Sequence, residues 1–204
     1  MLRGLPPIVV VGLLSLPSGA PGAAEDPEWP CVQRLVPELS PAMIWAGPPL
    51  GQTEAWDEDP VVRDLAPELA ARRVPLDDAV ARVAEVAQSL DPASRERTLT
   101  LLFAGVLEII DRERRSIIAG IKRFATSQAG LGERIRTTND ELRQLTGGDA
   151  AAEEMRRQAL RERRDWDIRI FDERQRSLPY LCEQPVLLEQ RAFALGRAIA
   201  GELK

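Results

Sequence analysis

The sequence predicts an all-α protein built around a long, coiled-coil-like antiparallel helical hairpin. Short helices should pack on its base, and an extended, proline-rich strap should precede them. From Phe103 to Leu145 the chain keeps a seven-residue repeat, Gly147-Gly148 offers a turn, and a second helical pattern follows. Ten of the thirteen repeat positions are apolar, so they form a seam that must pack on another helix. The seam consists of Phe103, Leu107, Ile110, Arg114, Ile117, Ile121, Phe124, Gln128, Leu131, Ile135, Thr138, Leu142 and Leu145.

Residues 1–24 have the pattern of a secretory signal peptide. Arg3 is their only charge, an apolar stretch follows it, and small residues lead up to Ala24, after which cleavage is expected. An uncleaved membrane anchor is the alternative, but the apolar run is short for a span of about 20 residues. The protein is therefore expected to be exported, either periplasmic or secreted, with no stable membrane span after cleavage.

Residues 25–59 are predicted to form an extended acidic strap. Seven prolines and three tryptophans occur between residues 27 and 60. Proline at this density prevents long helices, yet the segment is too apolar for a disordered tail. It should therefore lie across the helical body. A proline-rich docking segment for another protein is the alternative.

Cys31 and Cys182 are the two cysteines of the chain. In an exported protein such a pair predicts one disulfide, which here would fasten the strap to the hairpin. Neither cysteine lies in a C-x-x-C motif, so exchange chemistry of the thioredoxin type has no support. Two free thiols or an intermolecular bond are the alternatives.

Residues 60–204 are predicted to form the helical domain, beginning with short helices over 60–90. Asp-Pro pairs at 59–60 and 91–92 each supply an N-cap residue and a proline at the first helical position. Pro75 should start another helix, whose first turn carries two acidic residues that the helix dipole favours.

The hairpin arms are predicted over about 93–146 and 150–202. Folding the chain symmetrically about the turn sets Phe124 opposite Ile170 or Phe171. Pro179 should interrupt the second arm, because proline cannot donate a hydrogen bond and clashes with the preceding turn. The face of the returning arm that should pack inward carries Ala152, Met155, Ala159, Trp166 and Ile170.

Charge is distributed unevenly along the chain. Residues 25–60 contain eight acidic residues against one arginine, and residues 156–176 contain eight arginines against five acidic residues. The acidic strap and the basic arm are suited to pair within the molecule, and the alternative is that the arm meets an acidic partner. Loss of the signal changes the net charge from −5 to −6, and an exported, acidic chain is not expected to bind nucleic acid.

The chain has no histidine, which excludes Ser-His-Asp catalysis and histidine-ligated metals. No phosphate-binding glycine loop or EF-hand spacing is present. We therefore expect no catalytic residues, no metal and no cofactor. Arg114 interrupts the apolar seam and should pair with an acid or a free carbonyl; a ligand pocket near Arg114, Tyr180 and Glu183 is the alternative.

The leading hypothesis is an exported, non-enzymatic scaffold or adaptor that binds protein partners through its hairpin and strap. A holdase-like chaperone and a small-ligand or catalytic protein are alternatives. The returning arm has few large apolar side chains to cover the hairpin tip, so the tip should bind a second copy or a different partner. The residues expected to bind partners are Leu131, Ile135, Leu142, Leu145, Arg156, Arg157, Arg161, Arg163 and Arg164.

Overall fold

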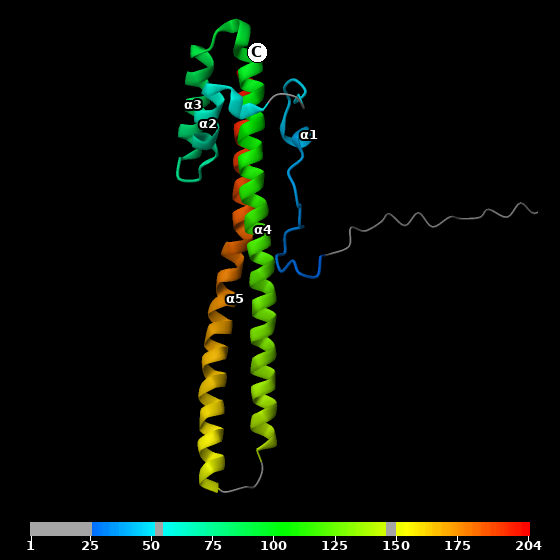
Figure 1. Cartoon of the computed structure of the whole chain (residues 1–204), viewed down its shortest axis with the longest axis vertical. Coiled ribbons are helices and arrows are strands. Elements are labelled where there is room, and N and C mark those ends of the chain that lie inside the picture. Colours follow the sequence, from blue (N-terminus) through cyan, green and yellow to red (C-terminus); the bar gives the residue numbers. More distant parts are fainter. Residues whose placement is uncertain (1–25, 52–54, 146–149) are drawn as a thin grey trace, which may run out of the picture.

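The computed structural model describes residues 26–51, 55–145 and 150–204, and these residues form the predicted all-α hairpin (Figure 1). The signal peptide predicted over residues 1–24 and the turn predicted at Gly147-Gly148 lie outside the described residues.

Two long helices form the hairpin. Helix α4 runs over Pro92–Gln144 and helix α5 over Ala150–Gly201, and the two pack antiparallel along their length (Figure 1). The predicted start of α4 is confirmed, because Asp91 Oδ1 accepts a hydrogen bond from the Ala93 amide at 2.8 Å. Figure 1 shows α5 reaching beyond the end of α4 at the hairpin tip, so the two arms are staggered.

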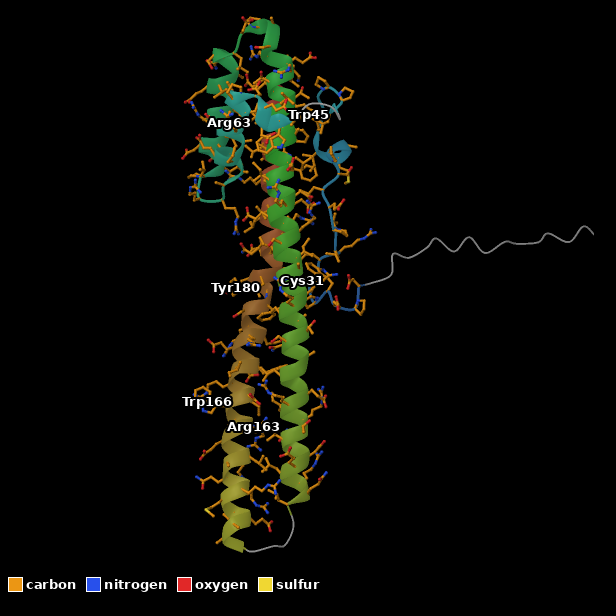
Figure 2. The ribbon with its side chains drawn as sticks, viewed as in Figure 1. Cys31, Trp45, Arg63, Arg163, Trp166 and Tyr180 are labelled. Carbon is orange, nitrogen blue, oxygen red and sulfur yellow. A yellow bond between two sulfur atoms is a disulfide. The ribbon has the colours of Figure 1, made fainter. Side chains whose placement is uncertain are left out.

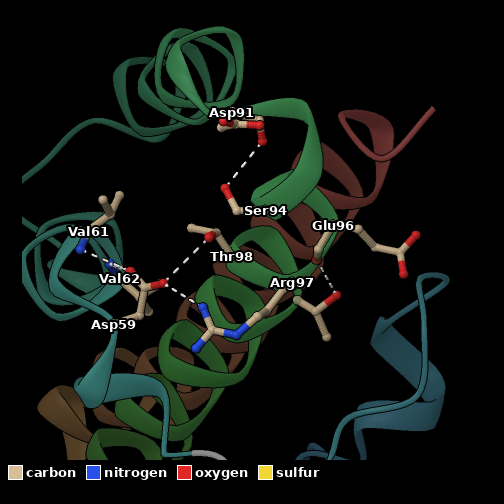
Figure 3. A network of polar contacts seen from close by, with 9 residues as sticks. Asp59, Val61, Val62, Asp91, Ser94, Glu96, Arg97 and Thr98 are labelled. Carbon is tan, nitrogen blue, oxygen red and sulfur yellow. Dashed lines mark hydrogen bonds and ion pairs between the residues drawn. The ribbon is translucent and has the colours of Figure 1, made fainter.

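Short helices α2 (Pro60–Ala70) and α3 (Leu76–Ser89) pack at the base of the hairpin. Asp59 caps α2 by accepting hydrogen bonds from the amides of Val61 and Val62 at 3.0 and 3.2 Å. Its second carboxylate oxygen accepts from Thr98 and pairs with Arg97, both on α4 (Figure 3). One N-cap side chain therefore starts a helix and also fixes it to its neighbour.

Arg191 of α5 holds the other end of α2. Its Nε donates to the Leu69 carbonyl at 2.7 Å and its Nη1 to the Val74 carbonyl at 2.9 Å. These carbonyls belong to the last turn of α2 and the loop before α3, where helix carbonyls lack helical partners. Burial lowers the pKa of the Arg191 guanidinium below its ordinary value, and both bonds compensate part of this desolvation.

The strap crosses the hairpin as predicted and contains the one-turn helix α1 (Pro41–Ile44) and the 3₁₀ turn η1 (Trp56–Glu58). Trp45 stacks on Phe103 of α4 with ring centroids 4.3 Å apart. Close packing needs two glycines: a Cβ on Gly105 would lie 2.8 Å from the Trp56 ring, and one on Gly196 would lie 2.9 Å from Ile44.

The predicted disulfide is present. Cys31 in the strap is bonded to Cys182 in α5, with Cα atoms 5.6 Å apart and a sequence separation of 151. Farther along the strap, the Leu39 amide donates to Asp111 Oδ1 at 2.9 Å. The strap is thus fixed to both long helices.

The prediction that Pro179 would interrupt the second arm is wrong. Helix α5 continues through Pro179 and Pro185 from Ala150 to Gly201. An interior proline costs about 3 kcal/mol of helix propensity. The segments on both sides pack against α4, and Cys182 and Pro185 between them are buried, so tertiary contacts outweigh this cost.

The predicted register and inner face of α5 are also wrong. Gln128 Nε2 donates to the Phe171 carbonyl at 2.8 Å. Phe171 of α5 therefore lies at the level of Gln128, which is one helical turn after the predicted partner Phe124 on α4. Met155 and Trp166 are 68% and 63% exposed. The predicted inner face and the face that packs on α4 both have residues spaced every three or four positions. The face that packs on α4 is partly charged, so the periodicity of apolar residues selected the other face.

Replacing Cys31 and Cys182 by serine should lower the free energy of unfolding by about 2 to 5 kcal/mol, because the bond closes a long loop in the unfolded chain. Urea unfolding of the oxidised protein and the double variant measures this difference. Reduction of the unaltered protein should reproduce it. Limited proteolysis should cut the variant at Arg34 faster; equal cleavage and equal stability would show that the strap is held without the disulfide.

Candidate functional site

A cavity of about 490 Å³ lies between the strap and the hairpin, beside the disulfide. Trp29, Leu35 and Val36 of the strap line one side, and Ile118 and Phe193 of the two long helices line the other. Ligand pockets of small molecules usually have volumes of about 300 to 1,000 Å³ and mostly apolar walls. The cavity therefore has the size and lining of a ligand pocket.

Arg114 lies at this cavity with its side chain only 4% exposed. Its Nη1 donates to the Val36 carbonyl, and its Nη2 lies 3.6 Å from Glu189 Oε2. Its Nε is buried with no hydrogen-bond partner among the described atoms. Burial lowers the pKa of Arg114, while Glu189 and Asp111 oppose this effect by attraction.

The structure confirms that the seam arginine pairs with an acid and a free carbonyl, but both partners differ from those expected. The carbonyl comes from Val36 in the strap, and the acid is Glu189, not Glu183. Tyr180 is 72% exposed, and neither it nor Glu183 lines the cavity. The predicted register set Arg114 opposite residues near Cys182, and Glu189 lies about two helical turns farther along α5.

The four apolar residues predicted at the hairpin tip are less exposed than expected. Leu131 is buried, at 3% exposure, and Ile135, Leu142 and Leu145 are half-buried. Helix α5 covers this part of the seam with the buried Leu160 and with polar side chains. Arg157, for example, pairs with Glu153 at 2.7 Å and donates to the Leu145 carbonyl at 3.0 Å. Whether these residues bind a partner stays a prediction.

A groove of about 320 Å³ at the tip gathers several of the predicted arginines. It is lined by Asn139, Leu142, Arg143, Arg157, Arg161 and Arg164. Acidic residues of the same arm neutralise part of this charge, since Arg161 lies 3.6 Å from Glu154 and Arg164 lies 2.8 Å from Asp165. Arg156 and Arg163 are exposed on other faces of α5.

The expected pairing of the acidic strap with the basic arm does not occur among the described residues. The strap acids pair instead with α4, through Asp26 with Lys122 at 2.5 Å and Glu38 with Arg115 at 3.5 Å. Lys122 also lowers the pKa of Asp26. The strap fixed by Cys31 runs along the basal half of the hairpin, so it lies away from the arginine-rich arm (Figure 2).

Polar contacts hold the two arms together. Arg134 of α4 donates to the Asp167 carboxylate of α5, with Nη2 2.8 Å from Oδ1. This bond lowers the pKa of Asp167 below its ordinary value of 3.8. Gln128 adds its bond to the Phe171 carbonyl. The sequence did not mark Asp167 as an interarm residue, because periodicity places its apolar neighbour Trp166 on the inner face, whereas Trp166 is exposed.

The structure also exposes a surface on α5 that the sequence pattern did not single out as exposed, which we name the outer stripe. Its members recur every three or four residues, and Figure 2 shows Trp166 projecting away from α4. Trp166 is 63% and Tyr180 72% exposed, and Arg169 lies over the Trp166 ring at 5.2 Å. The outer stripe consists of Ala159, Arg163, Trp166, Ile170, Glu173, Ser177 and Tyr180.

No cluster of potential metal ligands occurs in residues 26–51, 55–145 and 150–204. Within the same ranges no helix is long and apolar enough to cross a membrane. The chain matches no protein-family model, no curated protein and no solved structure.

Asp167→Asn should lower the free energy of unfolding at pH 7 by about 1 kcal/mol, because solvent screens Arg134, whose side chain is 55% exposed. A lowered pKa means that the carboxylate stabilises the folded state above pH 3.8 and that this contribution disappears as the pH falls through the folded-state pKa. Urea unfolding at pH 7 and near pH 3 should therefore show the difference shrinking. Asp172→Asn, at an exposed position of the same helix with no ion pair among the described residues, is the control. A pH-independent difference for Asp167→Asn would contradict the assignment.

Proposed function

We propose that this protein is an exported, non-enzymatic scaffold that binds protein partners through the outer stripe of α5. The observation that carries the proposal is the exposure of Trp166 and Tyr180 on the stripe, at 63% and 72%. Large aromatic side chains are typical anchors of protein interfaces. Export is supported by the signal-peptide pattern and by the disulfide between Cys31 and Cys182, which suits an oxidising compartment.

The charges of the outer stripe favour a second copy of the chain as the partner. Arg163 lies one turn before Trp166, and Glu173 lies one turn after Ile170. Neither charge has an ion-pair partner within 4 Å among the described residues, although Arg163 is close enough to Asp167 to lower its pKa. Both are exposed and free to meet charges of another molecule.

The stripe is complementary to itself when two copies of α5 lie antiparallel. With the two-fold axis between Trp166 and Ile170, each Trp166 faces Ile170 of the other copy. The same register sets each Arg163 against Glu173 and each Ala159 against Ser177. An isologous interface requires this kind of pairing, in which one patch meets its own copy. Apolar contacts lie at its centre and opposite charges at its rim, as in stable interfaces.

Such a dimer would form a linear scaffold. The arms would overlap side by side, and the bodies formed by α2, α3 and the strap would lie at opposite ends. The groove lined by Arg157, Arg161 and Arg164 would remain available at each tip for a different, acidic partner.

Trp166→Glu should weaken dimerisation at least 30-fold, because truncating a central aromatic anchor usually costs about 2 kcal/mol or more. Sedimentation equilibrium of the oxidised protein measures the dissociation constant. Ile168→Glu is the matched control, since Ile168 is 37% exposed on the opposite flank of the same helix. Equal weakening by both variants, or a monomeric unaltered protein, would reject the second copy as partner.

A charge exchange tests the register itself. Arg163→Glu and Glu173→Arg should each weaken the dimer, because each places like charges opposite one another. The double variant should recover most of the affinity. No recovery would reject the antiparallel register.

Affinity capture with the variant Leu142→Glu, Leu145→Glu tests the predicted tip surface separately. A partner that binds the unaltered protein and the Trp166 variant but not the tip variant would identify the tip as an adaptor site. Capture of many unrelated unfolded chains would favour the holdase-like alternative. If no protein binds any form and the chain is monomeric, the scaffold function is wrong.

A further inference from the structure

We propose that the cavity between the strap and the hairpin binds an amphipathic anion, a molecule with one negatively charged head group and a hydrocarbon tail. This site is separate from the outer stripe and independent of the scaffold function.

The cavity suits a tail of several methylene groups. Its volume is about 490 Å³, and the aromatic rings of Trp29 and Phe193 and the side chains of Leu35, Ile118 and Val186 line it. Trp29 is held in place because its Nε1 donates to the Gln33 carbonyl at 2.7 Å. A hydrocarbon chain gains affinity in proportion to the apolar surface that it buries.

The charges of the cavity favour an anionic head group. Arg34 and Arg197 both line it and are exposed, so they lie where the cavity meets solvent. Neither has an ion-pair partner within 4 Å among the described residues. The acidic residue of the lining, Glu189, is already paired with the buried Arg114. Two uncompensated guanidinium groups remain, and guanidinium binds carboxylates in bidentate geometry.

Other ligand classes fit this lining less well. A cation would meet three arginines and one carboxylate that is already paired. A sugar would need many neutral polar partners, and the neutral polar side chains of the lining are Gln33 and Gln190. An amphipathic anion uses both the apolar walls and the positive opening.

One wall of the site depends on the disulfide. Cys182 lines the cavity from α5, and its bond to Cys31 holds strap residues 29–36 against the hairpin. The contact between Arg114 and the Val36 carbonyl fixes the other end of this wall. Release of the strap would open the cavity, so ligand binding should require the oxidised protein.

Isothermal titration of the oxidised protein with decanoate tests the proposal. Decanoate should bind at one site per chain, and octanoate, two methylenes shorter, should bind on the order of tenfold more weakly. The neutral probe 1-decanol should bind more weakly than decanoate. Arg34→Gln with Arg197→Gln should weaken decanoate about threefold to tenfold, because exposed charge pairs contribute modestly, and should leave 1-decanol unchanged.

Val186→Trp should fill the cavity and weaken decanoate at least tenfold, whereas Leu187→Trp should not. Leu187 is the neighbouring residue, is 42% exposed and does not line the cavity. Reduction of the disulfide should also abolish binding. The proposal is overturned if millimolar decanoate does not bind, if Val186→Trp has no greater effect than Leu187→Trp, or if 1-decanol binds as tightly as decanoate. Circular dichroism of each variant confirms that the helices are intact.

Discussion

The contact between α4 and α5 is the interaction on which the rest of this structure depends. At the base it is apolar, and Leu99, Phe103, Leu188 and Leu195 are buried with at most 1% exposure. Burying side chains of this size stabilises a fold by about 1.5 to 3 kcal/mol each. The short helices and the strap pack onto this core, so their positions follow from the pairing of the two long helices.

Toward the tip the same contact changes character. Apolar packing becomes sparse there, with Leu131 and Leu160 buried, and polar contacts join it: Arg134 with Asp167, Gln128 with the Phe171 carbonyl and Arg157 with the Leu145 carbonyl. Polar pairs that are half exposed contribute little individually, so the arm owes its order to the continuity of the two helices as much as to any one contact. The charged inner face of α5 has a consequence for function. It leaves Trp166 and Tyr180 in solvent, where they are available to a partner.

The strap adds a second layer of organisation. It is fixed by the Cys31–Cys182 bond, by Asp111 accepting from the Leu39 amide, and by Trp45 stacked on Phe103. Between the first two of these contacts along the strap, Arg114 donates a hydrogen bond to the Val36 carbonyl, and the cavity lies beside Arg114. A buried arginine in an apolar seam is costly unless it is paired. Here its partners come from two different segments, which ties the strap, α4 and α5 together.

The sequence by itself determined the helical class, the starts of α2 and α4, and the disulfide. Each rests on local chemistry: Asp59 and Asp91 cap the helices beside them, the seam of α4 is mostly apolar over six repeats, and two cysteines allow one pairing. It also placed a polar contact at Arg114, because a charge in a seam needs a partner wherever that partner comes from.

Only the tertiary structure decided the rotation and register of α5. Two stripes on this helix have the same spacing, and the one with Trp166 is the more apolar, so periodicity favoured it. The fold turned Leu160, Asp167 and Phe171 inward instead, since hydrogen bonds across the arms and the packing of the base fix the helix as one rigid unit. For the same reason Pro179 did not end α5. Long-range packing determined both the orientation of α5 and its continuation through Pro179. Local patterns in the sequence do not contain this information.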